Sequence, residues 1–449
     1  MTASADASPH TTIQAVNQGC VVVWYRRDWR LDDNPALQQA IAEAQRLNVP
    51  LLPVICSLPA AVSSRHGDIP RGASVTAWVE QAQRALADGL QALGSGLWRV
   101  ADVAELIDLM QAAKALHVFA EDIALPYEQA EQAQVTQALK ASGARATFVW
   151  QSALFNAEQL PFRLTELPKV FTAFRQKVEN AGLRAKAPIA MPDRLPAAPD
   201  AAALRALATR VDPTPLPAMR DPRSSIASER LAGETGARAH WQSYLDRGLP
   251  HTYFETRNQL SGHDFSSQLS IDLAWGCVSV RRVIQMLDDF EATHGSTKSS
   301  YWLWFECMWR EHFRWVARVH GARMFHARGL APHAPKTRAR ERDWQRWTQG
   351  ETGHALIDAG MHELSATGFL SNRMRQIVAS YWLNDMGGDW RDGAAWFESQ
   401  LLDEDPYSNT GNWLYIAGLG TDPRGGRRFD PDKQAREHDP QGAYRRLWA

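Results

Sequence analysis

The sequence predicts an α/β N-terminal domain with a doubly wound parallel sheet, then a long linker and an all-helical C-terminal domain. Short β-branched runs alternate with helical patterns over the first third of the chain. Residues 184–227 are rich in Pro and Ala and poor in large apolar residues, which is typical of a linker. From about Ser228 the apolar residues recur with helical periodicity and strand-like runs are few. The predicted units are a disordered tail, an α/β domain, an interdomain linker and a helical domain, at 1–19, 20–150, 151–227 and 228–449.

Five runs of apolar and β-branched residues mark the strands expected in the first domain. They are VVVWY at 21–25, LLPVIC at 51–56, LWRV at 97–100, HVFAE at 117–121 and ATFVW at 146–150. A helical pattern follows each of the first four runs. This βαβ rhythm predicts right-handed crossovers, helices on both faces of the sheet, and ligands at the carboxyl ends of the strands.

The carboxyl end of the first strand lacks the motif of a dinucleotide-binding domain. After VVVWY the chain reads RRDWRLDDNPAL, without the GxGxxG that lets backbone approach a pyrophosphate. Asn34 or Asp33 followed by Pro35 instead makes a helix cap and a first turn. The sequence therefore argues against a nicotinamide-type site, and against an ordinary flavin or nicotinamide oxidoreductase.

The composition describes a globular protein without a global electrostatic attraction to any partner. The 449 residues carry a formal charge of -1, so affinity for nucleic acid has to arise from a local patch. Four widely spaced cysteines without CxxC spacing favour reduced thiols over disulfides or a metal site. The N-terminus lacks a signal-peptide pattern, and no apolar run reaches about 18 residues. We expect a cytoplasmic, monomeric protein with no membrane partner.

Residues 302–315, WLWFECMWREHFRW, place one carboxyl among many aromatic rings. On a helix, Glu306 shares a face with aromatic residues three and four positions away, among them Trp309. Such a carboxyl is either charged and paired, for example with Arg310, or desolvated with a raised pKa that lets it donate a hydrogen bond. The same pattern suits a core helix with one Glu–Arg pair at its edge.

Basic residues accumulate from Arg310 to Arg346 against few acids. Cations beside aromatic rings suit a nucleic-acid surface, because they bind phosphates while rings stack on unpaired bases. A solvated helix face followed by a basic loop explains the same residues. A second polar group, Asp403, Asp405 and Asn409, precedes Trp413 and could bind a flat heteroaromatic ring or simply cap helices.

Six motifs in order resemble the photolyase/cryptochrome family over nearly the whole chain, and most of all its cryptochrome DASH branch. YFETRN with the serine-rich turn after it, together with Gln376 and Tyr415, favours that branch. The motifs are VVVWYRRDWRLDDNPAL, LPFRLTELPKVFTAFRQKVE, TYFETRNQLSGHDFSSQLSIDLAWGCVS, YWLWFECMWREHFRW, WTQGETGHALIDAGMHELSATGFLSNRMRQIVAS and DWRDGAAWFESQLLDEDPYSNTGNW.

The resemblance implies FAD bound in a bent form inside the helical domain. It assigns a phosphate-binding turn to SSQLS, an ion pair beside the flavin to Arg375 and Asp403, and the position facing the reactive flavin nitrogen to Asn409. Hydroxyls and backbone N–H groups at a helix start suit a pyrophosphate. The residues assigned to FAD are Tyr253, Arg257, Ser266, Ser267, Gln268, Leu269, Ser270, Arg310, Arg375, Asp403, Asp405 and Asn409.

The resemblance also implies a substrate pocket and an electron path. Family enzymes act on a pyrimidine dimer extruded from the base stack, and the matching pocket residues are Glu306, Trp309, Asn372 and Gln376. Trp413 and Trp390 match the inner and middle tryptophans of a chain that passes electrons to the flavin. Where the third tryptophan is expected, the sequence reads Lys336-Thr337, which leaves Trp344 or Trp347 as substitutes. Ile271 and His354 also depart from the family pattern.

The implied function is blue-light-driven, FAD-dependent repair of cyclobutane pyrimidine dimers, with a preference for single-stranded DNA. The alternative is a blue-light photoreceptor that binds FAD, with or without nucleic acid, and repairs no DNA. The resemblance further implies a methenyltetrahydrofolate antenna in the N-terminal domain, for which Glu121 and Glu128 are candidate ligands. Acids that follow a strand also serve as helix caps and first-turn charges.

Overall fold

The computed structural model describes residues 19–217, 220–422 and 425–449, so the tail predicted at 1–19 lies outside them except for its last residue. The N-terminal domain contains a six-stranded sheet in the order β7-β6-β1-β2-β5-β8. All neighbouring strands are parallel except β5 and β8. The doubly wound parallel sheet is therefore confirmed. The strands are β1 Cys20–Tyr25, β2 Leu51–Cys56, β5 Trp98–Val100, β6 Ala115–Glu121, β7 Arg145–Val149 and β8 Thr209–Arg210.

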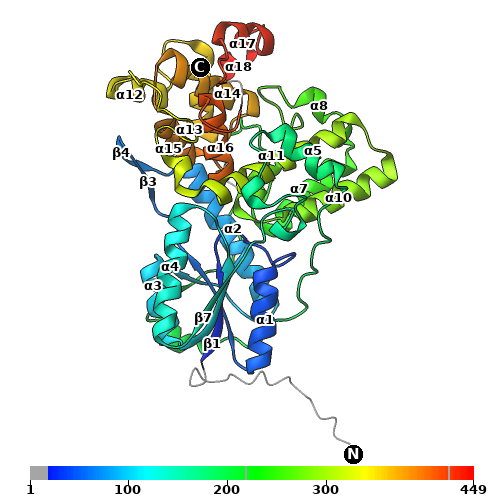
Figure 1. Cartoon of the computed structure of the whole chain (residues 1–449), viewed down its shortest axis with the longest axis vertical. Coiled ribbons are helices and arrows are strands. Elements are labelled where there is room, and N and C mark those ends of the chain that lie inside the picture. Colours follow the sequence, from blue (N-terminus) through cyan, green and yellow to red (C-terminus); the bar gives the residue numbers. More distant parts are fainter. Residues whose placement is uncertain (1–18, 218–219, 423–424) are drawn as a thin grey trace, which may run out of the picture.

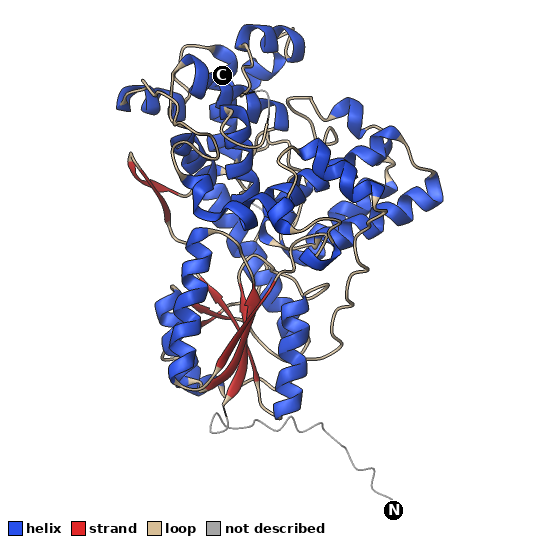
Figure 2. Cartoon of the chain, in the orientation of Figure 1, coloured by secondary structure: helices blue, strands red, loops and turns tan. Residues whose placement is uncertain are grey.

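Helices cover both faces of this sheet (Figure 2). The first begins as its sequence suggests: the Asn34 side chain accepts a hydrogen bond from the Leu37 N–H at 3.0 Å, and Pro35 occupies the first turn. The apolar residues of β1 are fully buried, because the strand lies at the centre of the sheet. The helices are α1 Pro35–Leu47, α2 Ala73–Ala92, α3 Val103–Ala112 and α4 Pro126–Ala141.

An antiparallel hairpin leaves the N-terminal domain and reaches the helical domain (Figure 1). It consists of β3 Ala61–Ser64 and β4 Gly67–Pro70 and packs on α15, Trp390–Gln400. Arg65 at its tip pairs with Asp392 of α15. The sequence analysis missed this hairpin, because four-residue strands with mostly polar side chains carry no clear period.

The linker predicted at 151–227 contains regular structure that binds both domains. Its helix α5, Phe171–Asn180, buries Phe171, Phe174 and Val178 in the main hydrophobic core. A four-residue helix, α6 Ala201–Leu204, precedes β8, which pairs with the edge of the sheet. A proline-rich composition therefore did not prevent local folding, because neighbouring elements supply the apolar surface.

Regular structure in the described residues of 228–449 is entirely helical, as expected (Figure 2). No helix in the described parts of the chain is long and apolar enough to span a membrane. The α-helices are α7 Gly233–Asp246, α8 Tyr253–Thr256, α9 Leu269–Trp275, α10 Val280–His294, α11 Lys298–His320, α12 Glu341–Gln349, α13 Ala355–Thr367, α14 Asn372–Ser380, α15 Trp390–Gln400, α16 Pro406–Ala417, α17 Pro431–His438 and α18 Ala443–Leu447.

The loop after β1 anchors the two domains to each other. Asp33 receives two hydrogen bonds of 2.9 Å from the Arg281 guanidinium in α10, and Arg282 binds Asp32 with two of 2.8 Å. Burial alone would raise the pKa of Asp33, but the hydrogen bonds and charge of Arg281 lower it overall. The RRDWRLDD segment thus forms ion pairs between the domains and also leads into the first helix.

A buried carboxyl in α13 makes the stability of the fold sensitive to pH. The Tyr444 hydroxyl donates to Glu363, and burial raises the pKa of Glu363 to about 8 from 4.5. The folded state therefore keeps a proton that the unfolded chain releases. The contribution of protonated Glu363 to the free energy of unfolding is complete below about pH 4.5 and is lost as the pH rises through about 8.

Glu363→Gln should therefore flatten part of this pH dependence. Between pH 5 and 9, the free energy of unfolding of the wild type should fall relative to that of Glu363→Gln by a few kcal/mol, on the order of what a shift of several pKa units implies. Urea denaturation across this pH range measures the difference, with the exposed Glu158→Gln as control. Parallel pH profiles for wild type and Glu363→Gln would contradict the prediction.

Candidate functional site

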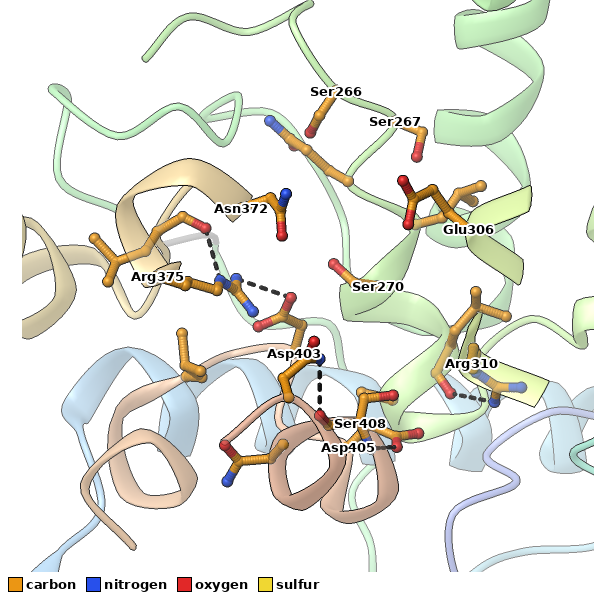
Figure 3. A pocket seen from close by; sticks show the side chains of 18 of the residues that line it. Ser266, Ser267, Ser270, Glu306, Arg310, Asn372, Arg375, Asp403, Asp405 and Ser408 are labelled. Carbon is orange, nitrogen blue, oxygen red and sulfur yellow. Dashed lines mark hydrogen bonds and ion pairs between the residues drawn. The ribbon is translucent and has the colours of Figure 1, made fainter. Parts of the chain in front are cut away.

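The helical domain encloses one pocket that brings together most of the predicted site residues (Figure 3). Its lining comes from α8, α9, α10, α11, α14, α15 and α16 and from loops between them. Among the predicted FAD and substrate residues, only Trp309 and Trp390 are absent from the lining. Segments more than 150 positions apart in the sequence thus converge on one cavity, which is what a large cofactor requires.

The serine-rich turn places three free hydroxyls at the cavity. Ser266, Ser267 and Ser270 line it, and Figure 3 shows their hydroxyl groups around the open centre. In the described residues, none of these hydroxyls has a protein hydrogen-bond partner, so all three can bind a ligand. Gln268, between them, has a left-handed backbone with φ 50° and is held by Arg230 at 2.9 Å. The turn therefore fits a polar, phosphate-bearing group.

Arg375 and Asp403 form the predicted ion pair at the cavity wall. Nη2 of Arg375 lies 2.9 Å from Oδ2 of Asp403, and its Nε donates to the Leu370 carbonyl at 2.9 Å (Figure 3). Oδ1 of Asp403 is buried without a protein partner among the described residues. A buried, unpaired carboxylate oxygen is costly, so this atom favours a ligand that donates a hydrogen bond.

Asp405 and Asn409 use part of their hydrogen-bonding capacity within the protein. Asp405 caps α16 by accepting from the Ser408 N–H at 2.8 Å, and it pairs with Arg314 at 2.6 Å. Burial would raise the pKa of Asp405, but the charge of Arg314 lowers it well below its usual range. The Asn409 amide donates to the Ala394 carbonyl at 3.0 Å, which fixes its orientation in the lining.

Glu306 lines the same cavity, but its ion-pair partner is not the arginine that the sequence suggested. Its carboxylate pairs with Arg257 and accepts from the Trp302 indole N–H at 3.1 Å. The suggested pair with Arg310 is wrong, because the Arg310 guanidinium donates across the domain to the Ser152 carbonyl at 2.8 Å. Arg310 still lines the cavity, and burial lowers its pKa to about 10.

Two opposed effects set the protonation of Glu306. Burial raises its pKa, whereas the charge of Arg257 and the hydrogen bond from Trp302 lower it, with a net increase. The side chain is 36 % exposed, so the cavity still hydrates part of it. A ligand that fills the cavity would remove this water and favour the protonated form further.

Trp309 lies outside the cavity lining and packs on the linker. Its ring stacks on Phe171 of α5, with centroids 3.8 Å apart and planes 13° apart, and contacts Tyr415 edge-on at 5.6 Å. Nearby, Arg373 donates to Gln376 at 3.0 Å, which orients that amide in the lining. Asn372 also reaches the cavity (Figure 3). Asn372 and Gln376 therefore share the cavity lining with Glu306, whereas Trp309 lies outside it.

The two tryptophans predicted for electron transfer have different surroundings. Trp413 lines the cavity and is 2 % exposed, and Gly393 leaves room for its ring because a Cβ at that position would overlap the indole. Trp390 is not in the lining, and its indole N–H donates to the Ala327 carbonyl at 3.2 Å. The structure thus joins Trp413, but not Trp390, directly to the site.

The basic residues predicted from 310 to 346 do not form one surface. Arg314 is buried in its pair with Asp405, and Arg318 pairs with Asp122 of the N-terminal domain. Most residues from Lys336 to Arg346 are exposed; Ala339 and Asp343 are half-buried, and Trp344 is buried. The prediction of a phosphate-binding surface therefore applies only to the exposed basic residues from Lys336 to Arg346.

The two acids suggested for an antenna do not share a cavity. Glu121 is 4 % exposed, its pKa is raised by burial, and it accepts from the Arg27 backbone N–H at 3.2 Å. A second cavity lies between α4, β7 and the end of α11, but neither Glu121 nor Glu128 lines it. The antenna therefore stays a prediction without a cavity that either side chain lines among the described residues.

The apolar part of the main cavity was missed by the sequence analysis. Leucine, alanine and phenylalanine residues that face a ligand look the same in a sequence as residues that face a core. Only their number on α9 and α11, beyond what one packed face needs, could have indicated a cavity. The missed apolar lining includes Leu273, Ala274, Leu303, Phe369, Leu401 and Ile416.

Comparisons with known proteins agree with this geometry. The model "DNA photolyase" matches residues 21–197, and "FAD binding domain of DNA photolyase" matches residues 302–449. The chain is 36 % identical to "Cryptochrome DASH" of Vibrio parahaemolyticus, covering 95 % of this chain and 92 % of that one. It is 35 % identical to "Cryptochrome DASH" of Xenopus laevis, with 95 % and 82 % covered.

Solved structures give the same result for the whole fold. The cryptochrome of Synechocystis sp. PCC6803 superposes with a TM-score of 0.87 at 33 % identity, covering 98 % of this chain and 89 % of that one. A class III photolyase from Agrobacterium tumefaciens gives 0.77 at 27 % identity, with 98 % and 88 % covered. The chain therefore belongs to the photolyase/cryptochrome family, with an N-terminal α/β domain and a C-terminal FAD-binding domain.

Proposed function

We propose that the protein uses blue light and FAD to repair cyclobutane pyrimidine dimers in DNA, preferring single strands. One observation carries the proposal. The carboxyl of Glu306, held by Arg257 and Trp302, stands in the same cavity as the FAD residues, with its pKa raised by burial. A protein that only binds FAD has no need for such a group at that place.

The protein's own groups would bind and polarise the lesion. When bound, FAD supplies the light-driven electron chemistry. Glu306 would donate a hydrogen bond to a lesion carbonyl, where negative charge develops during repair, and a preorganised donor lowers the barrier most at such an atom. A flipped dimer would lie beside Glu306, with Asn372 and Gln376 as further polar contacts. Trp309 would support this site from behind the lining, through its contact with Tyr415.

Asn409 supports repair chemistry rather than signalling. An amide can donate a hydrogen bond to a reduced, negatively charged flavin without delivering a mobile proton. The Asn409 side chain is fixed by its bond to the Ala394 carbonyl, so the proposed contact needs no rearrangement. A carboxylic acid at this position would instead exchange protons with the cofactor.

Illumination of the FAD-loaded protein with dimer-containing oligonucleotides tests the proposal. Dimers in single-stranded DNA should disappear under blue light, faster than those in a duplex, because the unpaired lesion leaves the stack at lower cost. Bound FAD without repair of either substrate would contradict the proposal and favour the photoreceptor alternative. We place the activity in a monomer and in the cytoplasm, and the four free cysteines support the reducing compartment.

DNA binding should weaken as salt rises. If the exposed basic residues contact about four phosphates, the logarithm of the association constant should fall against the logarithm of salt concentration with a slope of about -3 for a single strand. The double variant Lys336→Gln/Arg340→Gln should make this slope less negative by about 1.4. Arg46→Gln, an exposed change on α1, is the control. An equal slope in the double variant would exclude this segment as a phosphate surface.

A further inference from the structure

A connected group of tryptophans leads from the cavity toward the surface on the side of the β3–β4 hairpin. Trp413 contacts Trp347 edge-on, with ring centroids 6.3 Å apart. Trp347 in turn contacts Trp344 at 5.8 Å and stacks on Trp382 at 5.2 Å, and Trp344 contacts Trp382 at 5.6 Å. All four rings are buried, so their arrangement is fixed by packing.

Two details show how closely this group is packed. The Trp347 indole N–H donates to the Val378 carbonyl at 3.2 Å, and that of Trp382 donates to the Asp389 carbonyl at 2.8 Å. Trp382 lies directly over Gly388, where any Cβ would overlap its ring. The glycine therefore provides the space that the fourth indole occupies.

Trp344 contacts a fifth, half-buried indole, Trp396, edge-on at 6.0 Å, and it lies beneath a side chain from the other domain. The His66 ring of the hairpin stacks on Trp344, with centroids 4.7 Å apart and planes 8° apart. The two nitrogens of His66 face Glu341 and Asp392, the latter at 3.3 Å. Arg65 pairs with the same Asp392 and with Asp389 at 3.5 Å, so carboxylates, a guanidinium and an imidazole gather near Trp344.

Trp390 has no such connection. In residues 19–217, 220–422 and 425–449, its ring contacts no other aromatic ring, whereas Trp347 contacts four. The expected next position, Lys336-Thr337, is exposed and carries no ring. A path through Trp390 would therefore end without an aromatic partner.

We propose that electrons reach Trp413 through Trp344 and Trp347, with Trp344, beneath His66 and beside the half-buried Trp396, as the outermost member of the four-ring group. This proposal rests on the light-driven FAD chemistry proposed above. Under light, one electron leaves the Trp413 indole for FAD, Trp347 returns one to Trp413, and Trp344 returns one to Trp347. A soluble thiolate then gives one electron to the Trp344 radical cation and becomes a thiyl radical, which completes the balance.

Physical chemistry favours this sequence of rings. Electron transfer requires orbital overlap, which falls steeply with distance, and each step here joins rings in contact. Phe397 also contacts Trp413 and Trp347, but a benzene ring is far harder to oxidise than an indole and cannot hold the positive charge. At Trp344 the carboxylates of Glu341 and Asp392 favour a positive charge, partly offset by Arg65.

Matched Trp→Phe variants of the FAD-loaded protein test the route. Photoreduction of FAD under blue light, with dithiothreitol as the thiol, should slow at least about tenfold in Trp347→Phe, about 1.4 kcal/mol in activation free energy. It should slow less than about twofold in Trp390→Phe. Equal slowing in the two variants, or greater slowing in Trp390→Phe, overturns the proposal. FAD content and melting temperature establish that each variant is folded.

Trp344→Phe tests the outer end of the route even if Trp347→Phe fails to fold. After a laser flash without thiol, the indole radical seen by transient absorption should decay at least about tenfold faster than in the wild type, because the charge stays close to FAD and recombines. An unchanged lifetime overturns Trp344 as the outermost donor. Repair by wild-type protein reduced chemically in the dark does not use the route, so its failure would contradict only the proposed function.

Discussion

Trp413→Phe should suppress light-driven reduction of FAD by at least about a hundredfold, or about 2.7 kcal/mol in activation free energy, while FAD stays bound. Trp413 is the only member of the tryptophan group that lines the cavity among the described residues, so every electron on this route passes through it. Phenylalanine keeps most of the packing against Gly393 but removes the easily oxidised indole. The rate of FAD bleaching under blue light with a thiol donor measures the effect.

Trp98→Phe is the matched control for this experiment. Trp98 is also buried, at 4 % exposure, but lies in β5 of the N-terminal sheet, away from the cavity lining. Its replacement should leave the photoreduction rate unchanged. An unaltered rate in Trp413→Phe itself would refute its place in the electron path. Loss of FAD from the variant would instead assign the ring a structural role at the cofactor.

Glu306→Gln should lower dimer repair about tenfold without releasing FAD, and Glu306→Ala should lower it about a hundredfold. The glutamine amide still donates a hydrogen bond, but it loses the pairing with Arg257 and donates more weakly than a carboxylic acid. Alanine removes the donor entirely. Repair is best measured on protein reduced chemically in the dark, which separates the lesion chemistry from photoreduction.

The pH dependence of repair provides a second measure of the same group. Only protonated Glu306 donates to the lesion, and burial raises its pKa. Wild-type repair should therefore fall as the pH rises through that pKa, whereas Glu306→Gln should show no such fall. The same profile in both proteins would show that Glu306 acts only by packing or by holding Arg257.

Local signals made much of the fold predictable from the sequence. Period-2 and period-3.6 patterns located the five parallel strands and the helical half, and Asn34 with Pro35 located a helix start. The ordered motifs from Tyr253 onward identified most of the polar lining of the cavity, because the family resemblance assigns roles to those residues. Arg375 with Asp403 is the clearest case, since the two residues lie 28 positions apart and meet at 2.9 Å.

The sequence did not predict which residues far apart in the chain contact each other in the fold. Glu306 had a nearby cation one helical turn away in Arg310, but it pairs with Arg257, which only the tertiary fold brings close. The hairpin tip and its stack on Trp344 join residues 278 positions apart. A sequence shows how many tryptophans a chain has, but the contacts among them depend on packing between elements.

The close approach of Gly388 to Trp382 sets the order in which the two positions can change during evolution. A chain with any side chain at 388 cannot accept an indole at 382, so the glycine has to arise first and the tryptophan second. Reversal must follow the opposite order. Glycine at 388 and tryptophan at 382 therefore depend on each other. A related sequence that has both residues is expected to share this ring arrangement.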